Sequence, residues 1–176
     1  MTFKILDRKS IYQGRAFDVE QVLASLPNGR QQRYDLVSHL PAVTLVPYDS
    51  DGNLWFVSQF RLGAMHELLE LPAGVLEEGE PPETGAAREI REEIGKAAGV
   101  LRELGAFYMA AGYSSEYMHI FLATGLYDAP LAADADEFLE VRVIPVDEVY
   151  RMVQQNEIHD GKTLSALLLA EPYLRH

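Results

Sequence analysis

The sequence predicts an α/β (α+β) fold in which a mixed β-sheet lies between helices and is preceded by a small antiparallel β-sheet. Three observations support this class. Residues 3–38 alternate polar and apolar side chains around short turns, residues 68–95 follow a strand–loop–helix pattern, and two helical patterns follow the last apolar strand. Strands and helices mixed along one chain are typical of a sheet that is covered by helical layers.

The first 38 residues are predicted to form an antiparallel meander. Turn sequences interrupt the alternation at Gln13-Gly14 and at Pro27-Asn28-Gly29, and such turns connect neighbouring strands. We therefore expect a β-sheet subdomain over residues 1–39 and a larger domain over residues 40–176.

Further strands and helices are expected in the larger domain, where Asp51-Gly52 separates two strand-like runs and predicts a hairpin. The expected strands cover residues 42–47, 54–60, 68–71, 105–109, 117–123 and 138–144. One helix is expected after Pro145. Another is expected over residues 163–170, ending before Pro172 because proline removes a helical hydrogen bond. Its leucines are expected in the core: Leu164, Leu167, Leu168 and Leu169.

A helix is also predicted between Pro81-Pro82 and Gly95, because proline is tolerated in a first turn and glycine ends helices. At about 100° per residue, one arc of this helix is apolar and carries Ala86, Ala87, Ile90 and Ile94. A second arc, centred well away from the first, carries Glu89, Glu92 and Glu93. The sequence therefore predicts an amphipathic helix with an acidic outer face.

This acidic face is unfavourable unless a cation lies against it. Glu89 and Glu93 are four residues apart and destabilise an isolated helix by about 0.2–0.5 kcal/mol, and only Glu92 has an obvious partner, Arg88. The preceding loop can aim carbonyl oxygens at the same place, and oxygen ligands suit a hard cation such as Mg²⁺ or Mn²⁺. The alternative is a solvated acidic face.

Composition excludes several classes of protein. The chain has 176 residues, of which 48% are hydrophobic, and this suffices for one core with room for a small subdomain. A net charge of −12 argues against a nucleic-acid-binding surface. The absence of cysteine excludes disulfides and thiol catalysis, and no apolar run reaches the length of a membrane span. We therefore expect a cytoplasmic protein.

One window carries a motif that resembles a known family. Residues 74–96 read Gly-x5-Glu-x7-Arg-Glu-Ile-x-Glu-Glu-x-Gly-Lys, which resembles the signature, or box, of the Nudix hydrolases. Every fixed position matches except the last, where the family expects an apolar residue and this chain has Lys96. The resemblance implies an α/β/α sandwich with a mixed sheet, in agreement with the fold predicted above.

The resemblance also implies how a metal is held. In this family the residues matching Glu89 and Glu93 bind the metals, and the main-chain carbonyl matching Ala73 often joins them. Glu92 lies beside them, and the arginine matching Arg88 usually orients a glutamate. The implied cofactor is Mg²⁺, with Mn²⁺ as an alternative, because a divalent cation neutralises carboxylates and phosphates and activates a water.

Flanking residues narrow the resemblance to the ADP-ribose pyrophosphatase branch. Gln59-Phe60-Arg61, the run from Glu70 to Gly74 and the N-terminal meander are similar to that branch over nearly the whole chain. The resemblance implies Mg²⁺-dependent hydrolysis of ADP-ribose, or of a related nucleoside diphosphate sugar, to AMP and ribose 5-phosphate. That branch typically has a Ser-Pro-Gly turn after the box, whereas this chain has Ala111 in place of the proline.

The resemblance further implies a catalytic base and substrate contacts. The family often places its base on the loop before the last strand of the sheet, where Glu137 is expected as base or third metal ligand. The alternatives are a solvated acidic loop at Glu137 and Glu116 as the base. The expected substrate-binding residues are Arg61, Glu70, Gly112, Glu116, Arg33 and Phe17.

Two of these residues imply a dimer. Arg33 and Phe17 resemble positions that the branch uses for phosphate contact and adenine stacking across a homodimer, although both also suit ordinary surface or core positions.

Arg61 suits a phosphate clamp, because a guanidinium matches two phosphate oxygens. The alternative for Arg61 is a surface salt bridge.

Other functions fit the sequence less well. A Nudix-like sensor that binds nucleotide sugars without hydrolysis is expected to carry a degenerate box, and here every box carboxylate is present. A nucleoside triphosphate pyrophosphohydrolase is disfavoured by the β-rich N-terminus. Gly161-Lys162-Thr163 resembles the end of a P-loop, but residue 156 is Asn rather than Gly, which excludes that motif.

Overall fold

The chain forms two units, each with its own β-sheet, in a computed structural model that describes residues 2–132 and 138–175. The first unit comprises Met1–Pro41 and Phe107–Tyr117, and the second comprises Ala42–Ala106 and Met118–His176. The sequence did not indicate that residues 107–117 belong with the N-terminal sheet.

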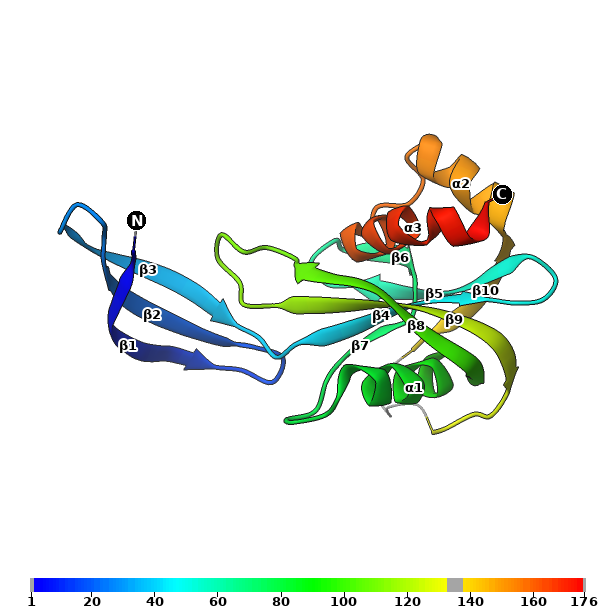
Figure 1. Ribbon diagram of the computed structural model, residues 1–176, viewed down its shortest axis with the longest axis horizontal. Coiled ribbons are helices and arrows are strands. Elements are labelled where there is room, and N and C mark those ends of the chain that lie inside the picture. Colours follow the sequence, from blue (N-terminus) through cyan, green and yellow to red (C-terminus); the bar gives the residue numbers. More distant parts are fainter. Residues whose placement is uncertain (1, 133–137, 176) are drawn as a thin grey trace. The chain divides into compact units, whose positions relative to one another are not determined.

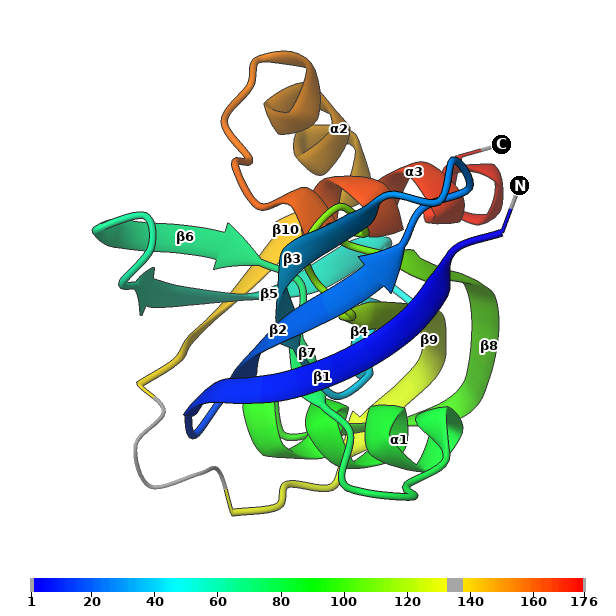
Figure 2. The same ribbon diagram turned by 90° about the vertical axis from the view of Figure 1, so that its left-hand side faces the viewer.

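The first unit contains a three-stranded antiparallel sheet in the order β1–β2–β3, as the alternation predicted (Figure 2). Its strands are β1 (Lys4–Gln13), β2 (Asp18–Ser25) and β3 (Gln31–Ser38). The segment 107–117 joins this unit through main-chain hydrogen bonds to Val37. The Val37 N–H donates to the Tyr113 carbonyl at 2.8 Å, and the Ser115 N–H donates to the Val37 carbonyl at 3.0 Å.

The second unit is built on a seven-stranded mixed sheet. The main path runs β10–β5–β4–β9–β8, with β6 paired to β5 and β7 paired to β4. Strands β4 and β9 are parallel, whereas β4 is antiparallel to β7. The strands are β4 (Ala42–Tyr48), β5 (Asn53–Arg61), β6 (His66–Glu70), β7 (Ala73–Val75), β8 (Lys96–Tyr108), β9 (Tyr117–Asp128) and β10 (Glu140–Pro145).

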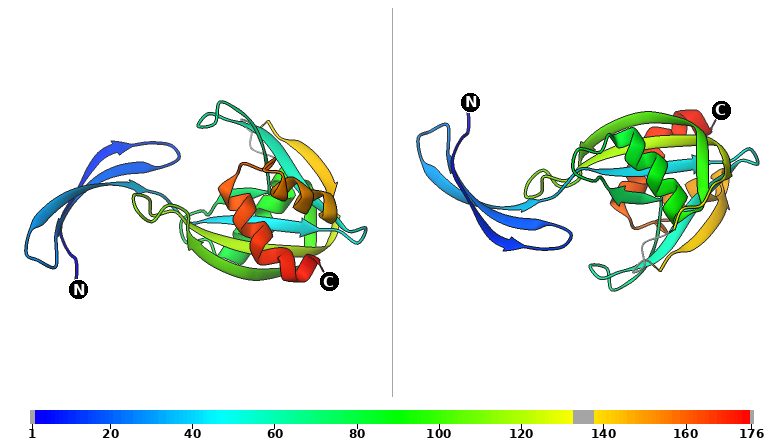
Figure 3. Two further views of the ribbon diagram at one scale, coloured as in Figure 1. Left: turned by 90° about the horizontal axis from the view of Figure 1, so that it is seen from above. Right: turned by 90° about the horizontal axis from the view of Figure 1, so that it is seen from below.

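Helices cover both faces of this second sheet. Helix α1 (Pro82–Glu93) lies on one face, and α2 (Val146–Gln154) and α3 (Gly161–Leu174) lie on the other (Figures 1 and 3). The three layers agree with the predicted α/β/α sandwich. No helix within the described part of the chain is long and apolar enough to cross a membrane.

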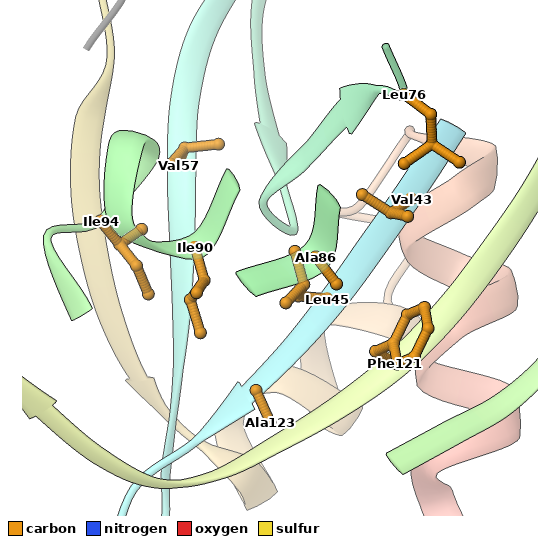
Figure 4. Close-up of a cluster of buried hydrophobic side chains, with 9 residues drawn as sticks. All are labelled: Val43, Leu45, Val57, Leu76, Ala86, Ile90, Ile94, Phe121 and Ala123. Carbon is orange, nitrogen blue, oxygen red and sulfur yellow. The ribbon is translucent and has the colours of Figure 1, made fainter. Parts of the chain in front are cut away.

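The core beneath α1 shows why the helix takes its orientation. Ala86, Ile90 and Ile94 pack against side chains of the central strands β4, β5 and β9 (Figure 4). Burying these apolar groups stabilises the layer by about 25 cal/mol per Å² of apolar surface removed from water. This contact fixes which other residues of α1 face strand β7.

Three expectations for β8 and α3 were wrong. Strand β8 begins at Lys96 rather than near residue 105, because sheet pairing holds an alanine- and glycine-rich stretch whose own strand propensity is low. Helix α3 continues to Leu174 through Pro172, although proline removes one helical hydrogen bond, and Leu174 beyond it is buried. Leu168 was expected in the core, but it is 69% exposed, whereas Leu167 is buried.

Candidate active site

Helix α1 presents the predicted carboxylates to strand β7. Its apolar side is occupied by the core, and its remaining buried side contacts β7. The helix ends before Gly95, whose φ of 70° lies in the left-handed region that favours glycine. The residues at its two ends thus set where the helix begins and ends. The helical repeat then determines which way the glutamates point.

Glu89 and Glu93 lie on this buried side and are only 7% and 6% exposed. Glu93 Oε2 accepts a hydrogen bond from the Ala73 N–H at 3.0 Å. The Glu89 carboxylate lies against Gly74, where an added Cβ would be 2.0 Å from Oε1. The predicted outer acidic face was therefore wrong for these two residues, because β7 covers them. The structure brings Ala73, Glu89 and Glu93 together.

Arg88 connects the carboxylates of this cluster. Its Nη1 donates to Glu89 at 2.7 Å and to Glu92 at 2.8 Å, while Nε and Nη2 donate to Glu80 at 3.1 and 2.9 Å. The hydrogen bonds, chiefly those to Glu80, raise the pKa of Arg88, and they lower the pKa of Glu80. The expectation that only Glu92 has a partner was wrong, because one guanidinium reaches three carboxylates.

The chemistry of the cluster fits a hard cation. The guanidinium of Arg88 binds the carboxylates of Glu80, Glu89 and Glu92, and Glu93 adds a fourth, buried carboxylate to the same helix. Buried negative charge is costly unless it is paired. Oxygen donors of this kind suit Mg²⁺ or Mn²⁺. Within residues 2–132 and 138–175, no three His, Asp or Glu side chains converge closely enough to hold a metal alone.

A second ion-pair cluster lies three residues before Ala73. Glu70 is 1% exposed, and Arg61 Nε and Nη2 each donate to it at 2.7 Å. Lys162 Nζ donates to the same carboxylate. Burial alone raises the pKa of Glu70, but the hydrogen bond from Arg61 and the charge of Lys162 lower it overall. Arg61 is 42% exposed, and its Nη1 has no hydrogen-bond partner in the part of the chain described, so one edge of the guanidinium is available to an anion.

Comparison with known proteins identifies the family. Residues 38–167 match the NUDIX domain. The protein belongs to the Nudix family.

Three similar proteins match this chain over nearly their whole lengths. The ADP-ribose pyrophosphatase of Bacillus subtilis is 34% identical over 166 residues, which cover 93% of this chain and 90% of the relative. The methanol dehydrogenase activator of Bacillus methanolicus is 30% identical, with 98% and 96% covered. The crystal structure of an ADP compounds hydrolase matches with a TM-score of 0.88 at 28% identity, covering 99% of this chain and 95% of the other. The predicted fold and family are thus confirmed, and the protein is a Nudix hydrolase.

Lys96, the one departure from the Nudix box, packs where the family expects an apolar residue. Its Nζ lies 4.6 Å from the centroid of the Trp55 ring and donates to Asp128 at 2.6 Å. The aliphatic stem of a lysine can cover apolar surface while its charge contacts an aromatic face. The substitution is therefore accommodated beside the helix.

Four predicted substrate residues of the Nudix hydrolase belong to the first unit. Arg33 Nη1 donates to Gln21 at 3.2 Å, and Phe17 is 44% exposed. Gly112 lines an apolar hollow on the three-stranded sheet, and the Glu116 carbonyl accepts a hydrogen bond within the β8–β9 connection. Their roles stay predictions. Glu137, the predicted base, lies outside the described residues.

Sequence reasoning missed Lys162 and Thr163 at the start of α3. Both contact the segment that precedes Ala73: Lys162 binds Glu70, and Thr163 binds the main chain of Leu71. The available signal was Gly161-Lys162-Thr163, which in the sequence resembles only the end of a P-loop. A sequence separation of about ninety residues gives no periodic pattern from which such contacts can be inferred.

Proposed function

We propose that this Nudix hydrolase cleaves the pyrophosphate bond of ADP-ribose, giving AMP and ribose 5-phosphate, with Mg²⁺ as cofactor. The observation that carries the proposal is the 34% identity to an ADP-ribose pyrophosphatase across nine-tenths of both chains. Similarity of this extent reaches well beyond the Nudix box, into the segments on which substrate choice depends. The match to an ADP compounds hydrolase over 99% of this chain supports the same class of substrate.

The buried carboxylates support the divalent cation. Glu89, Glu93 and the Ala73 carbonyl would hold it, with Glu92 at the more exposed edge of the cluster. When bound, the cation neutralises substrate phosphates and activates a water. Mn²⁺ is the alternative cofactor, because it accepts the same oxygen ligands.

The remaining side chains position the reactants and accept a proton. Arg88 fixes the carboxylates of Glu89 and Glu92 through charged hydrogen bonds, so less reorganisation is needed when substrate arrives. Arg61, oriented by Glu70, offers its exposed edge to a phosphate. We assign Glu137 as the base that takes the proton of the attacking water, with Glu116 as the alternative.

We also infer a homodimer that uses the first unit. Its sheet and turns leave large apolar side chains exposed, including Phe3, Ile5, Ile11, Tyr12, Phe17 and Tyr34. Monomeric proteins rarely expose large contiguous apolar patches. In this dimer Phe17 and Arg33 contact the substrate. Light scattering that reports one chain per particle contradicts the dimer.

The cytoplasmic location and the lack of nucleic-acid binding stay predictions from composition.

The proposed substrate is tested with a panel of nucleotides. Purified protein is incubated with Mg²⁺ and ADP-ribose, GDP-mannose or a nucleoside triphosphate, and the products are separated by chromatography. We expect AMP and ribose 5-phosphate from ADP-ribose at the highest rate. Faster cleavage of either other compound refutes the assignment of ADP-ribose.

The role of the carboxylates is tested with a matched pair of variants. Glu93→Gln should lower turnover of ADP-ribose about 100-fold or more, because it removes a charged ligand for the cation. Its circular dichroism spectrum should remain that of the parent. Glu83→Gln is the control, since Glu83 is an exposed residue of the same helix. Equal losses in both variants contradict a metal-binding role for Glu93.

A second candidate is a binding protein without hydrolysis. The 30% identity to an activator of a dehydrogenase favours it, because that relative is named for its effect on another enzyme. If a nucleotide sugar binds tightly in calorimetry but no substrate is cleaved with Mg²⁺ or Mn²⁺, this second candidate replaces the first.

A further inference from the structure

The N-terminus of α3 forms a closed hydrogen-bonded cluster. Asp160 caps the helix, because its Oδ2 accepts from the Thr163 N–H at 3.0 Å. The same oxygen accepts from Thr163 Oγ1 at 2.6 Å and from Lys162 Nζ at 3.0 Å. Thr163 is fully buried, and the side chains of Lys162 and Asp160 are only 12% and 15% exposed. Such a cluster is rigid, because each polar group has a partner.

This cluster also binds the segment that leads to Ala73. Thr163 Oγ1 accepts a hydrogen bond from the Leu71 N–H at 2.9 Å while it donates its own proton to Asp160. Lys162 Nζ donates to the buried Glu70 carboxylate. Helix α3 therefore contacts two consecutive residues of the chain, one through its main chain and one through its side chain.

Each residue from Glu70 to Ala73 is held by a hydrogen bond to another part of the second unit. Pro72 contributes its carbonyl, which accepts from the Leu45 N–H at 2.8 Å, and Ala73 contributes its N–H, which Glu93 accepts. Contacts to Glu70 and Leu71 come from α3, and the contact to Ala73 comes from α1. These helices cover opposite faces of the sheet (Figure 3), so the segment is held from both sides.

We propose that Lys162 and Thr163 are positioning residues of the active site. They hold the segment 70–73, and through it they set the place of the Ala73 carbonyl and of the Arg61 guanidinium, which Glu70 orients. This inference rests on the proposed function for its catalytic consequence. The arrangement of the segment itself is independent of the substrate.

Thr163→Val tests the proposal most directly, because valine has nearly the same shape but can neither accept from Leu71 nor donate to Asp160. Of these two hydrogen bonds, the one from Leu71 holds the segment, and losing one buried hydrogen bond of this kind corresponds to about a 3- to 10-fold change in an equilibrium. We expect Mn²⁺ affinity, measured by calorimetry without substrate, to fall by about that factor, and kcat to fall similarly with a smaller change in KM. Thr163→Ser keeps the hydroxyl and should restore both. Ser165→Ala is the control, since the Ser165 hydroxyl binds only the Gly161 carbonyl of its own helix among the residues described.

Hydrogen exchange separates this inference from the proposed function. In metal-free protein, the amides of Leu71 and Ala73 should exchange about 10-fold faster in Thr163→Val than in the parent or in Ser165→Ala. If the parent neither binds Mn²⁺ nor hydrolyses ADP-ribose, the proposed function fails. The exchange rates of the Leu71 and Ala73 amides still test whether Thr163 holds the segment 70–73 in place. A Thr163→Val protein with a lower Tm but unchanged exchange, metal affinity and kcat overturns the inference. If that variant does not fold, Lys162→Met is measured in the same three assays. This variant removes the hydrogen bond from α3 to Glu70, while Arg61 still binds that carboxylate. Mn²⁺ affinity and kcat should fall and the Ala73 amide should exchange faster, and unchanged values overturn the inference.

Discussion

Replacing Gly74 with alanine should displace the Glu89 carboxylate. The added Cβ would lie 2.0 Å from Oε1, 2.1 Å from Cδ and 2.3 Å from Oε2. Carbon atoms that are not bonded stay about 3.5 Å apart or more, so the carboxylate has to move by roughly 1.5 Å. The carboxylate is the end of a side chain with several rotatable bonds, so rotation of the side chain can absorb the movement without unfolding the helix.

Movement of this size matters more for catalysis than for stability. A misplacement of about 1 Å in a catalytic arrangement can lower the rate about 100-fold. We therefore expect kcat/KM for ADP-ribose to fall about 100-fold in Gly74→Ala, and the Mg²⁺ concentration for half-maximal activity to rise. The free energy of unfolding should fall by only about 1 kcal/mol, the cost of an unfavourable side-chain rotamer.

The assay is hydrolysis of ADP-ribose over a series of Mg²⁺ concentrations, with urea unfolding of each variant. Gly63→Ala is the matched control, because nothing lies within 4 Å of its added Cβ. The reasoning is refuted if Gly74→Ala keeps its activity and metal dependence within about 2-fold of the parent. It is equally refuted if the loss of activity only follows a loss of folded protein.

Three further predictions concern stability. Glu70→Gln should have a lower free energy of unfolding than the parent at pH 7, because folding lowers the pKa of Glu70 and so stabilises the ionised carboxylate. The parent loses this stabilisation as the pH falls below the ordinary pKa of 4.5. The difference in free energy between the two proteins should therefore become smaller in unfolding curves measured in acid. Thr44→Val should raise the free energy of unfolding by about 1 kcal/mol, because the Thr44 hydroxyl is buried without a partner among the described residues; an unchanged or lower Tm contradicts this. Arg88→Met should lower that free energy by about 3 kcal/mol, because it leaves Glu80, Glu89 and Glu92 without their shared cation. Urea unfolding at neutral pH measures the effect, and a variant as stable as the parent shows that the shared cation is unimportant.

The residues of the box could be predicted because their relation is local. Glu89 and Glu93 stand one turn apart on any α-helix, and Gly95 ends that helix in a conformation that suits glycine. The same periodicity did not show that β7 covers these glutamates, since burial depends on a strand that pairs with β4 rather than on the helix. Nor did it show that Arg88 binds the residue next to it in sequence as well as Glu80.

The sequence by itself determined the family, the order of the main elements and the helix face that carries the carboxylates. These follow from local periodicity and from fixed spacing within a single segment. The tertiary structure alone decided that Glu70 is buried between Arg61 and Lys162, and that Thr163 holds the main chain of Leu71. The contacts of Lys162 and Thr163 join residues 92 positions apart, and they exist because the fold brings the start of α3 against the segment before Ala73, which no local pattern encodes.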